Sequence, residues 1–309
     1  MRMEIIVDNL EKDYKEIKAV NHISFSVEKG EVYGIIGPNG AGKTTLMEIM
    51  LGLRKQDRGT VTIQGMDTVK DHKKLVYHVG AQLQQSELPT NIKVKEAVKL
   101  QAALFKKKID VNQMLEDFNL REKAGAYCSK LSGGQRQRLF ILLAVIHDPD
   151  IVFFDELSTG LDPVSRQDVW NYVGRLKNRG KTIIVSTHYM QEAEQICDRI
   201  MLVNNGRIVD IGTSETLTEK LPFSHVLDFE IDGREEGFMK DLAAMEGFLS
   251  YENLNNQKYR IFVKKDFSID RLLSNKKFKI RGFASRESQF EDYFYYKVKM
   301  EEQKNGGNF

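Results

Sequence analysis

The chain has 309 residues, with 46 Lys and Arg against 44 Asp and Glu and a formal net charge of +2. This length allows one large domain and a small one, and the near-neutral balance gives no sign of general nucleic-acid binding. The longest apolar run, 139–146, falls well short of the roughly 20 residues of a bilayer-spanning helix, and the start lacks the apolar core of a signal peptide. Cys128 and Cys197 lie far apart without metal-type partners, which favours reduced thiols.

A glycine-rich loop lies between a predicted strand, 32–36, and a predicted helix that stops near Gly52. It fits the pattern G-x-x-x-x-G-K-[ST] and consists of Gly37, Pro38, Asn39, Gly40, Ala41, Gly42, Lys43 and Thr44. Backbone N–H groups and the positive end of the helix favour a polyphosphate there. We expect Lys43 to reach its β- and γ-phosphates and Thr44 to ligate Mg²⁺. The alternative is a chance glycine turn.

A lysine-rich segment with a helical pattern follows, over residues 86–130, with predicted helices at 94–105 and 111–119. It ends at a second short motif, which consists of Leu131, Ser132, Gly133, Gly134 and Gln135.

The second motif opens a predicted helix that runs to about His147, and Ser132 with Gln135 forms a capping box for it. A cap does not explain Gly133 and Gly134, because each costs about 1 kcal/mol of helix propensity relative to Ala. We therefore expect something to approach this backbone closely. A hydroxyl, bare N–H groups and a helix dipole on one N-terminus predict a second anion site.

Two adjacent carboxylates, Asp155 and Glu156, end the apolar stretch that begins at Asp150. Neighbouring residues on a strand point to opposite faces, so we expect Asp155 to face the Mg²⁺ site and Glu156 a water near the γ-phosphate. The alternative is a strand end with ordinary helix-capping acids.

In this order, residues 37–45, 131–135 and 154–156 resemble the ATP-binding subunit of an ABC transporter, over roughly residues 1–220. The resemblance implies ATP bound by the glycine loop through Thr45, with the 131–135 segment of one subunit closing over the ATP of its partner in a homodimer or heterodimer. It makes Glu156 the general base, or the carboxylate that positions water, and Asp155 a partner of Mg²⁺ through water. Leu157 and Ser158 depart from the Pro-Thr of many relatives.

The same resemblance implies roles for four further positions. Tyr14 matches the aromatic that stacks on adenine, and His188 the residue that contacts the γ-phosphate. Asp162 matches a loop that communicates across the dimer, and is equally a helix N-cap before Pro163. The glutamine that senses nucleotide, and belongs to the metal set, is expected among Gln82, Gln84 and Gln85, and the register favours Gln84.

The predicted fold class is α/β: a P-loop NTPase core with a mostly parallel sheet, an antiparallel β subdomain and a helical subdomain at about 86–147. We expect this ATP-binding domain over 1–220 and an α+β accessory domain over 221–309. The downstream order strand, helix, strand, strand, helix, strand suggests a ferredoxin-like domain, with its last strand over 278–283. Residues 288–294 resemble the closing helix of ATPases that serve ABC-2-type exporters.

Charge in the second domain is uneven. Residues 258–281 hold nine Lys or Arg against two Asp, whereas 228–252 hold eight acids against two bases. The basic half could contact anionic lipid headgroups or a regulatory partner. The alternative, which we favour, is pairing between the two halves.

The resulting hypothesis is an Mg²⁺- and ATP-dependent ATPase that energises export through a separate integral membrane permease, at the cytoplasmic face of the membrane. One alternative is a soluble ABC-type ATPase without transport, which generally has a coiled coil between the two motifs or two cassettes in tandem. Another is a nucleotide-gated regulatory module, which is expected to lack the base that Glu156 supplies.

Overall fold

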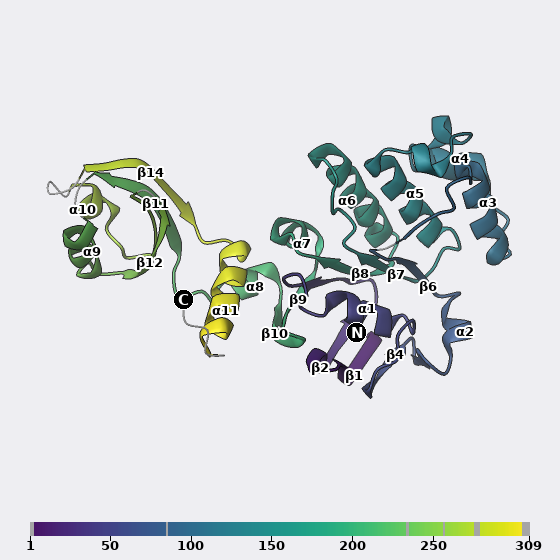
Figure 1. The fold of residues 1–309 in the computed structure, drawn as a ribbon, viewed down its shortest axis with the longest axis horizontal. Coiled ribbons are helices and arrows are strands. Elements are labelled where there is room, and N and C mark those ends of the chain that lie inside the picture. The colour runs from purple at the N-terminus through teal and green to yellow at the C-terminus, as the bar shows by residue number, and fades with distance from the viewer. Residues whose placement is uncertain (1–2, 85, 233–234, 256, 275–278, 305–309) are drawn as a thin grey trace. The chain divides into compact units, whose positions relative to one another are not determined.

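The computed structural model describes residues 3–84, 86–232, 235–255, 257–274 and 279–304 (Figure 1). It divides into two compact units, Met1–Thr213 and Ser214–Phe309. The division falls before α8 (Ser214–Thr218) and not at the expected residues 220 and 221, because α8 packs against α11 (Phe290–Lys304).

A six-stranded sheet forms the centre of the first unit. Its strand order is β10 (Arg207–Gly212), β9 (Arg199–Asn204), β3 (Val32–Ile36), β8 (Thr182–Thr187), β7 (Ile151–Asp155) and β6 (Val79–Gln82). All neighbours are parallel except β9 and β10, which form an antiparallel pair. The expected mostly parallel sheet is therefore confirmed.

Successive residues of the central strands face two separate cores. In β7, Val152 and Phe154 pack with α3 (Val94–Leu104), α5 (Gly133–Val145) and α6 (Pro163–Asn178). Ile151 and Phe153 pack on the other side with α1 (Lys43–Met50) and an antiparallel sheet. Figure 1 shows α3, α5 and α6 on one side of the central strands and α1 on the other. This alternation is the period-2 pattern of a strand that is buried on both faces.

The antiparallel sheet has the order β2 (Ile17–Glu28), β1 (Met3–Tyr14), β4 (Arg58–Ile63) and β5 (Met66–Asp67). The helical subdomain contains α3, α4 (Val111–Asp117) and α5, with short 3₁₀ turns at Arg121–Lys123 and Cys128–Lys130. The remaining helices of this unit are α2 (His72–Leu75) and α7 (Met190–Ile196). Within the described residues, no helix is long and apolar enough to cross a membrane.

The second unit has the expected order of elements: β11 (His225–Asp232), α9 (Glu235–Ala243), β12 (Phe248–Asn255), β13 (Lys258–Val263), α10 (Ile269–Leu273) and β14 (Lys279–Glu287). The sheet order is β12-β13-β11-β14, and all three neighbouring pairs are antiparallel. This split βαβ arrangement is ferredoxin-like, as predicted. Phe278, the expected start of the last strand, lies outside the described residues.

Acidic and basic side chains of this sheet pair with one another. Arg260 on β13 donates two hydrogen bonds to Asp228 on β11, at 2.7 and 2.8 Å. Lys258 lies 3.0 Å from Glu230, and Arg281 on β14 lies 2.8 Å from Asp232 on β11. The strand register places these residues opposite or beside each other. These contacts favour mutual pairing over lipid contact for this part of the basic segment.

Two glycines provide a matched test of packing in the first unit. A Cβ atom at Gly80 on β6 would lie 2.1 Å from the Ala144 carbonyl oxygen on α5, whereas one at Gly174 in α6 would meet no atom within 4 Å. Gly80→Ala should therefore lower the free energy of unfolding by about 1–3 kcal/mol. Gly174→Ala should raise it by about 0.5–1 kcal/mol through helix propensity.

Denaturant unfolding followed by tryptophan fluorescence measures both effects. Trp170 is the sole tryptophan of the chain and lies buried in α6, so its emission follows the first unit alone. Equal stability of the Gly80→Ala protein and the wild type would contradict the close approach of β6 and α5.

Candidate functional site

The glycine loop lies between β3 and α1, and its backbone requires glycine at particular positions. Gly42 has φ 100°, and a Cβ atom there would lie 2.0 Å from the Ala19 carbonyl oxygen on β2. A Cβ atom at Gly37 would lie 2.2 Å from the Val203 carbonyl oxygen on β9. α1 begins at Lys43 without a side-chain cap and without an acid in its first turn. Its first N–H groups are therefore free of competing side-chain acceptors, as an anion site requires.

The Lys43 side chain lies inside this loop. Its ammonium group donates hydrogen bonds to the carbonyl oxygens of Gly37 at 2.8 Å and Pro38 at 3.0 Å, and the residue is 5% exposed. Burial lowers the pKa of Lys43, while the nearby Glu156 and Asp155 charges partly oppose this effect. The lysine and the two carboxylates therefore belong to one electrostatic site.

Asp155 ends β7 and is fully buried. Its Oδ1 accepts a hydrogen bond from the Ser186 hydroxyl on β8, whereas the buried Oδ2 has no hydrogen-bond partner. Burial raises the pKa of Asp155, and Ser186, the Thr44 hydroxyl and Lys43 limit this rise. The sequence placed Thr44 and Asp155 together through Mg²⁺, and the structure brings the two side chains to the same place.

Glu156 lies just beyond the end of β7, so strand alternation does not set its direction. Its φ of 51° is left-handed, which is uncommon for a residue other than glycine. We expected Asp155 and Glu156 to point to opposite faces because they share a strand. That reason was wrong, because only Asp155 belongs to β7. The turn at Glu156 redirects the side chain, and the Glu156 N–H donates to the Ser186 carbonyl oxygen at 3.1 Å.

Three side chains from separate segments meet the Glu156 carboxylate. Gln84, just after β6, donates from Nε2 to Oε2 at 3.0 Å, and the Thr159 hydroxyl donates to the same oxygen at 3.3 Å. His188 Nδ1, just after β8, lies 3.4 Å from Oε1. Gln84 and His188, both candidate site residues from the sequence, thus contact the Glu156 side chain.

Of the other two candidate glutamines, Gln82 is buried at the end of β6, where its side chain donates to the Leu83 carbonyl oxygen at 2.9 Å. Gln85 lies outside the described residues. Of the two described glutamines, Gln84 is the one whose side chain contacts Glu156.

Tyr14 lies at the turn between β1 and β2 and is 37% exposed. The Lys12 ammonium and the Arg54 guanidinium lie 5.6 and 5.4 Å from its ring centroid. Arg54 also pairs with Glu48 on α1 at 2.6 Å, which ties the tyrosine to the helix that follows the glycine loop. The Tyr14 ring is thus partly exposed to solvent and lies beside two cations.

The second motif forms the capping box that the sequence predicts. The Ser132 hydroxyl accepts from the Gln135 N–H at 3.3 Å, and the Gln135 side chain accepts from the Ser132 N–H at 3.1 Å. A Cβ atom at Gly134 would lie 2.4 Å from the Ser165 hydroxyl on α6 of the same chain, whereas one at Gly133 would only touch Leu161 at 3.8 Å. Packing within the chain thus explains why residue 134 is glycine, but it does not explain the glycine at position 133.

Asp162 caps α6. Its carboxylate accepts from the N–H groups of Val164 at 3.1 Å and Ser165 at 3.0 Å, and from the Ser165 hydroxyl at 2.7 Å. These hydrogen bonds lower the pKa of Asp162. Asp162 and Gly134 both contact Ser165, so the cap of α6 lies against the start of α5.

One buried network was missed by sequence reasoning. Glu192 on α7 is 5% exposed and accepts hydrogen bonds from the Ser158 hydroxyl at 2.6 and 2.7 Å and from the Thr187 hydroxyl at 3.0 Å. Arg166 on α6 lies 3.4 Å from the same carboxylate. The network joins the loop after Glu156 to the residue before His188. The unusual Ser158 was the available signal, but its partner is distant in sequence.

A glycine loop between β3 and α1, a lysine within it and a carboxylate pair at the end of β7, on the far side of β8 in the sheet, define a nucleoside triphosphatase of the P-loop class. The family model described as ABC transporter matches residues 20–159. A Nod factor export ATP-binding protein I of Burkholderia orbicola (strain AU 1054) is 37% identical over 238 residues, 75% of this chain and 78% of that protein. The chain belongs to the ABC transporter family of ATP-binding proteins, which hydrolyse ATP.

Other comparisons agree. The daunorubicin resistance ATP-binding protein DrrA3 of Streptomyces coeruleorubidus is 34% identical, covering 69% of this chain and 71% of that protein. A solved ATP-binding subunit of an ABC transporter superposes with a TM-score of 0.63 and 25% identity, over 70% of this chain and 92% of the other. A nucleotide-free ATP-binding cassette from an ABC transporter gives a TM-score of 0.61 and 27% identity, over 69% and 92%.

Removal of the Ser158 hydroxyl tests the buried network. Ser158→Ala leaves the buried Glu192 carboxylate without one of its donors, so the free energy of unfolding should fall by about 1–3 kcal/mol, while Ser158→Thr should retain most of it. Ser129→Ala is the control, because the Ser129 hydroxyl makes an exposed hydrogen bond to the Thr90 carbonyl oxygen at 3.0 Å. Trp170 fluorescence during denaturant unfolding provides the measurement. Equal losses for Ser158→Ala and Ser129→Ala would contradict a stabilising role.

Proposed function

We propose that this chain is the ATP-hydrolysing subunit of an ABC exporter, works as a dimer and energises a separate membrane permease at the cytoplasmic face of the membrane. The observation that carries the hydrolytic part is the convergence of Gln84 and His188 on Glu156, beside Lys43 and Asp155. Export is supported by the names of the relatives, which refer to Nod factor export and daunorubicin resistance.

In this proposal Lys43 and the loop N–H groups hold the phosphates, and Glu156 orients and deprotonates the attacking water. His188 contacts the γ-phosphate, and Tyr14 stacks on adenine. Gln84 hydrogen-bonds to Glu156 and directly precedes the segment that leads into the helical subdomain. A change at the phosphates therefore has a short route to a partner surface.

The residues also fit a bound Mg²⁺. Asp155 Oδ2 is a buried carboxylate oxygen without a hydrogen-bond partner, the Thr44 hydroxyl lies nearby, and both are hard oxygen ligands of the kind that Mg²⁺ prefers. When bound, Mg²⁺ would neutralise developing charge on the phosphates. Thr44 would bind it directly, and Asp155 and Gln84 would hold its waters.

The dimer is supported by the contrast between the two glycines of the second motif. Gly134 has an intrachain neighbour, whereas Ser132 and Gly133 are exposed at the N-terminus of α5. In the proposed dimer these exposed groups would cover the γ-phosphate on the partner's loop, so that each site is completed by the other copy.

Two substitutions separate binding from hydrolysis. Lys43→Ala should abolish nucleotide binding, because it removes the only cation inside the loop among the described residues. Glu156→Gln keeps the size and the hydrogen-bonding capacity of the side chain but removes the base, so ATP should bind while turnover falls by about 100-fold or more. Binding of a fluorescent ATP analogue and phosphate release measure the two steps. Wild-type turnover by the Glu156→Gln protein would exclude its assigned role.

Gly133→Val tests the shared site. ATP affinity of the monomer should stay within about twofold, because, among the described residues, the one atom within 4 Å of a Cβ added at Gly133 belongs to Leu161 and not to the glycine loop. ATP-dependent dimerisation and hydrolysis should be lost. Gly174→Ala serves as the glycine control on α6. Light scattering of the Glu156→Gln protein with ATP, with and without Gly133→Val, measures the dimer. An unaffected dimer in the double variant would refute the shared site.

A further inference from the structure

The lysine-rich segment of the helical subdomain carries a basic surface that the ATPase site does not use. Residues 93–110 contain six lysines against Glu96 and Asp110. Four of these lysines are exposed, and no ion pair joins them to an acid within the described ranges: Lys99, Lys106, Lys107 and Lys108. The basic charge of this segment is therefore available to a partner.

Both acids of the segment are engaged by helix ends. Glu96 accepts from the Lys93 N–H at 2.9 Å in the capping box of α3, and Asp110 accepts from the N–H groups of Asn112 and Gln113 at 2.9 and 3.1 Å at the start of α4. Each carboxylate faces backbone donors and forms no ion pair with a lysine in the described structure. The segment thus differs from the C-terminal sheet, where Arg260 and Lys258 are paired with acids.

Three of the four exposed lysines line a shallow hollow of about 550 Å³ between the end of α3 and the start of α4. Its lining combines three lysines with small or apolar side chains and the capping aspartate, namely Lys99, Ala102, Ala103, Lys107, Lys108, Ile109, Asp110 and Val111. The net charge of the residues that line this hollow is positive, which favours an anionic headgroup.

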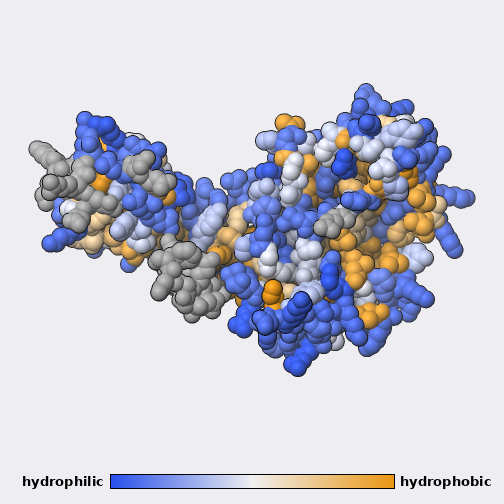
Figure 2. Space-filling model, in the orientation of Figure 1, coloured by the Kyte–Doolittle hydropathy of each residue, from blue (hydrophilic) through white to orange (hydrophobic). Residues whose placement is uncertain are grey.

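Exposed leucines accompany this positive charge. Leu100 and Leu104, one helical turn apart on α3, are 55% and 65% exposed. Figure 2 shows hydrophobic and hydrophilic surface side by side at the position that α3 occupies in Figure 1. Exposed leucines within a few residues of exposed lysines match the composition of surfaces that lie on anionic membranes.

Lys106 occupies a position at the end of α3 where glycine is usual. α3 ends in a turn in which the Lys107 N–H donates to the Ala102 carbonyl oxygen at 3.0 Å, and Lys106 has φ 52°. Helices that end in this way commonly place glycine in the left-handed position. The strained lysine adds to the exposed positive charge of Lys107 and Lys108.

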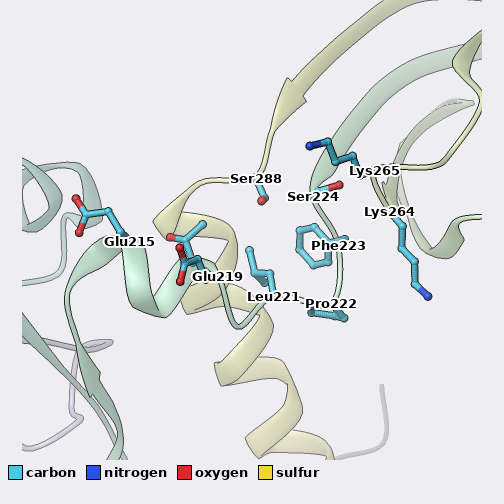
Figure 3. Close-up of a pocket in the computed structure, with 10 residues that line it drawn as sticks. Glu215, Glu219, Leu221, Pro222, Phe223, Ser224, Lys264, Lys265 and Ser288 are labelled. Atoms are coloured by element: carbon cyan, nitrogen blue, oxygen red, sulfur yellow. The ribbon is translucent and has the colours of Figure 1, made fainter.

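The second unit offers a useful contrast. A hollow of about 480 Å³ there has Glu215 and Glu219 on one side and Lys264 and Lys265 on the other (Figure 3). Because its rim carries both signs, it does not select for anions.

We propose that the surface formed by Lys99, Leu100, Leu104 and Lys106–Lys108 binds anionic phospholipid headgroups of the membrane that holds the permease. The proposal uses the proposed function only for its cellular setting. Positive charge attracts the anionic surface within a Debye length, and the leucines enter the interface.

The test is co-sedimentation of the purified full chain with vesicles of phosphatidylcholine alone or mixed with phosphatidylglycerol. The wild type should bind only the mixed vesicles, and more weakly at high salt. Replacement of Lys99, Lys107 and Lys108 by alanine should weaken binding by roughly 100-fold, because each lysine near an anionic surface contributes about a fivefold effect. Leu100→Ser with Leu104→Ser should remove the part of the binding that persists at high salt.

The matched control replaces Lys264, Lys265 and Lys279 by alanine. These lysines are exposed, belong to the C-terminal basic segment and change the net charge equally. Their variant should bind like the wild type. Absence of wild-type binding, as expected if the surface serves an acidic protein instead, or equal loss in both triple variants would overturn the proposal. Full displacement by excess glycerol phosphate would also overturn it in favour of a free-phosphate site.

Phosphate release by the same preparations keeps the two proposals apart. The alanine variants lie outside the ATPase site and should hydrolyse ATP at the wild-type rate. Vesicle binding that is lost while hydrolysis stays intact assigns the effect to this surface alone. Absence of ATP hydrolysis by the wild type would instead contradict the proposed function.

Discussion

The parallel pairing of β3, β8, β7 and β6 is the constraint on which the site depends. In a parallel sheet all carboxyl ends lie at one edge, so residues that follow different strands become neighbours. The glycine loop follows β3, Glu156 follows β7, His188 follows β8 and Gln84 follows β6. Segments that lie far apart in sequence therefore meet without any long-range motif that specifies the contact. Burial on both faces holds these strands in register, and the same burial perturbs the pKa values of Lys43 and Asp155.

Local chemistry made much of this predictable. The glycine loop, the capping box at Ser132 and the N-cap at Asp162 depend on residues within a few positions of each other, and their backbone hydrogen bonds leave few alternatives. The ferredoxin-like order of the second unit followed from the predicted order of its strands and helices. Short-range rules therefore predicted the elements and the caps of α5 and α6.

What escaped prediction depends on distant contacts. No local sequence pattern predicts the left-handed turn at Glu156. A hydrogen bond from its N–H to the Ser186 carbonyl oxygen on β8 stabilises this turn. The partner of Ser158 is Glu192, on a helix beyond the next strand. Gly134 is explained by Ser165 of α6 rather than by a ligand. The unit boundary shifted because α8 packs on α11, a contact that neither segment reveals alone. In each case the chain brings together residues whose relation only the tertiary structure determines.

The two basic segments show how structure changes the meaning of composition. Both are rich in lysine or arginine, and from sequence the C-terminal one carried the larger excess. Strands in register place Asp228 and Glu230 beside Arg260 and Lys258, so that the charges of these two bases are paired within the sheet. In α3 and the turn after it, the nearby acids cap helices instead, and the lysines remain exposed. Net charge in a segment therefore predicts an anionic partner only where the fold leaves it unpaired, and in this chain that condition is met beside Leu100 and Leu104.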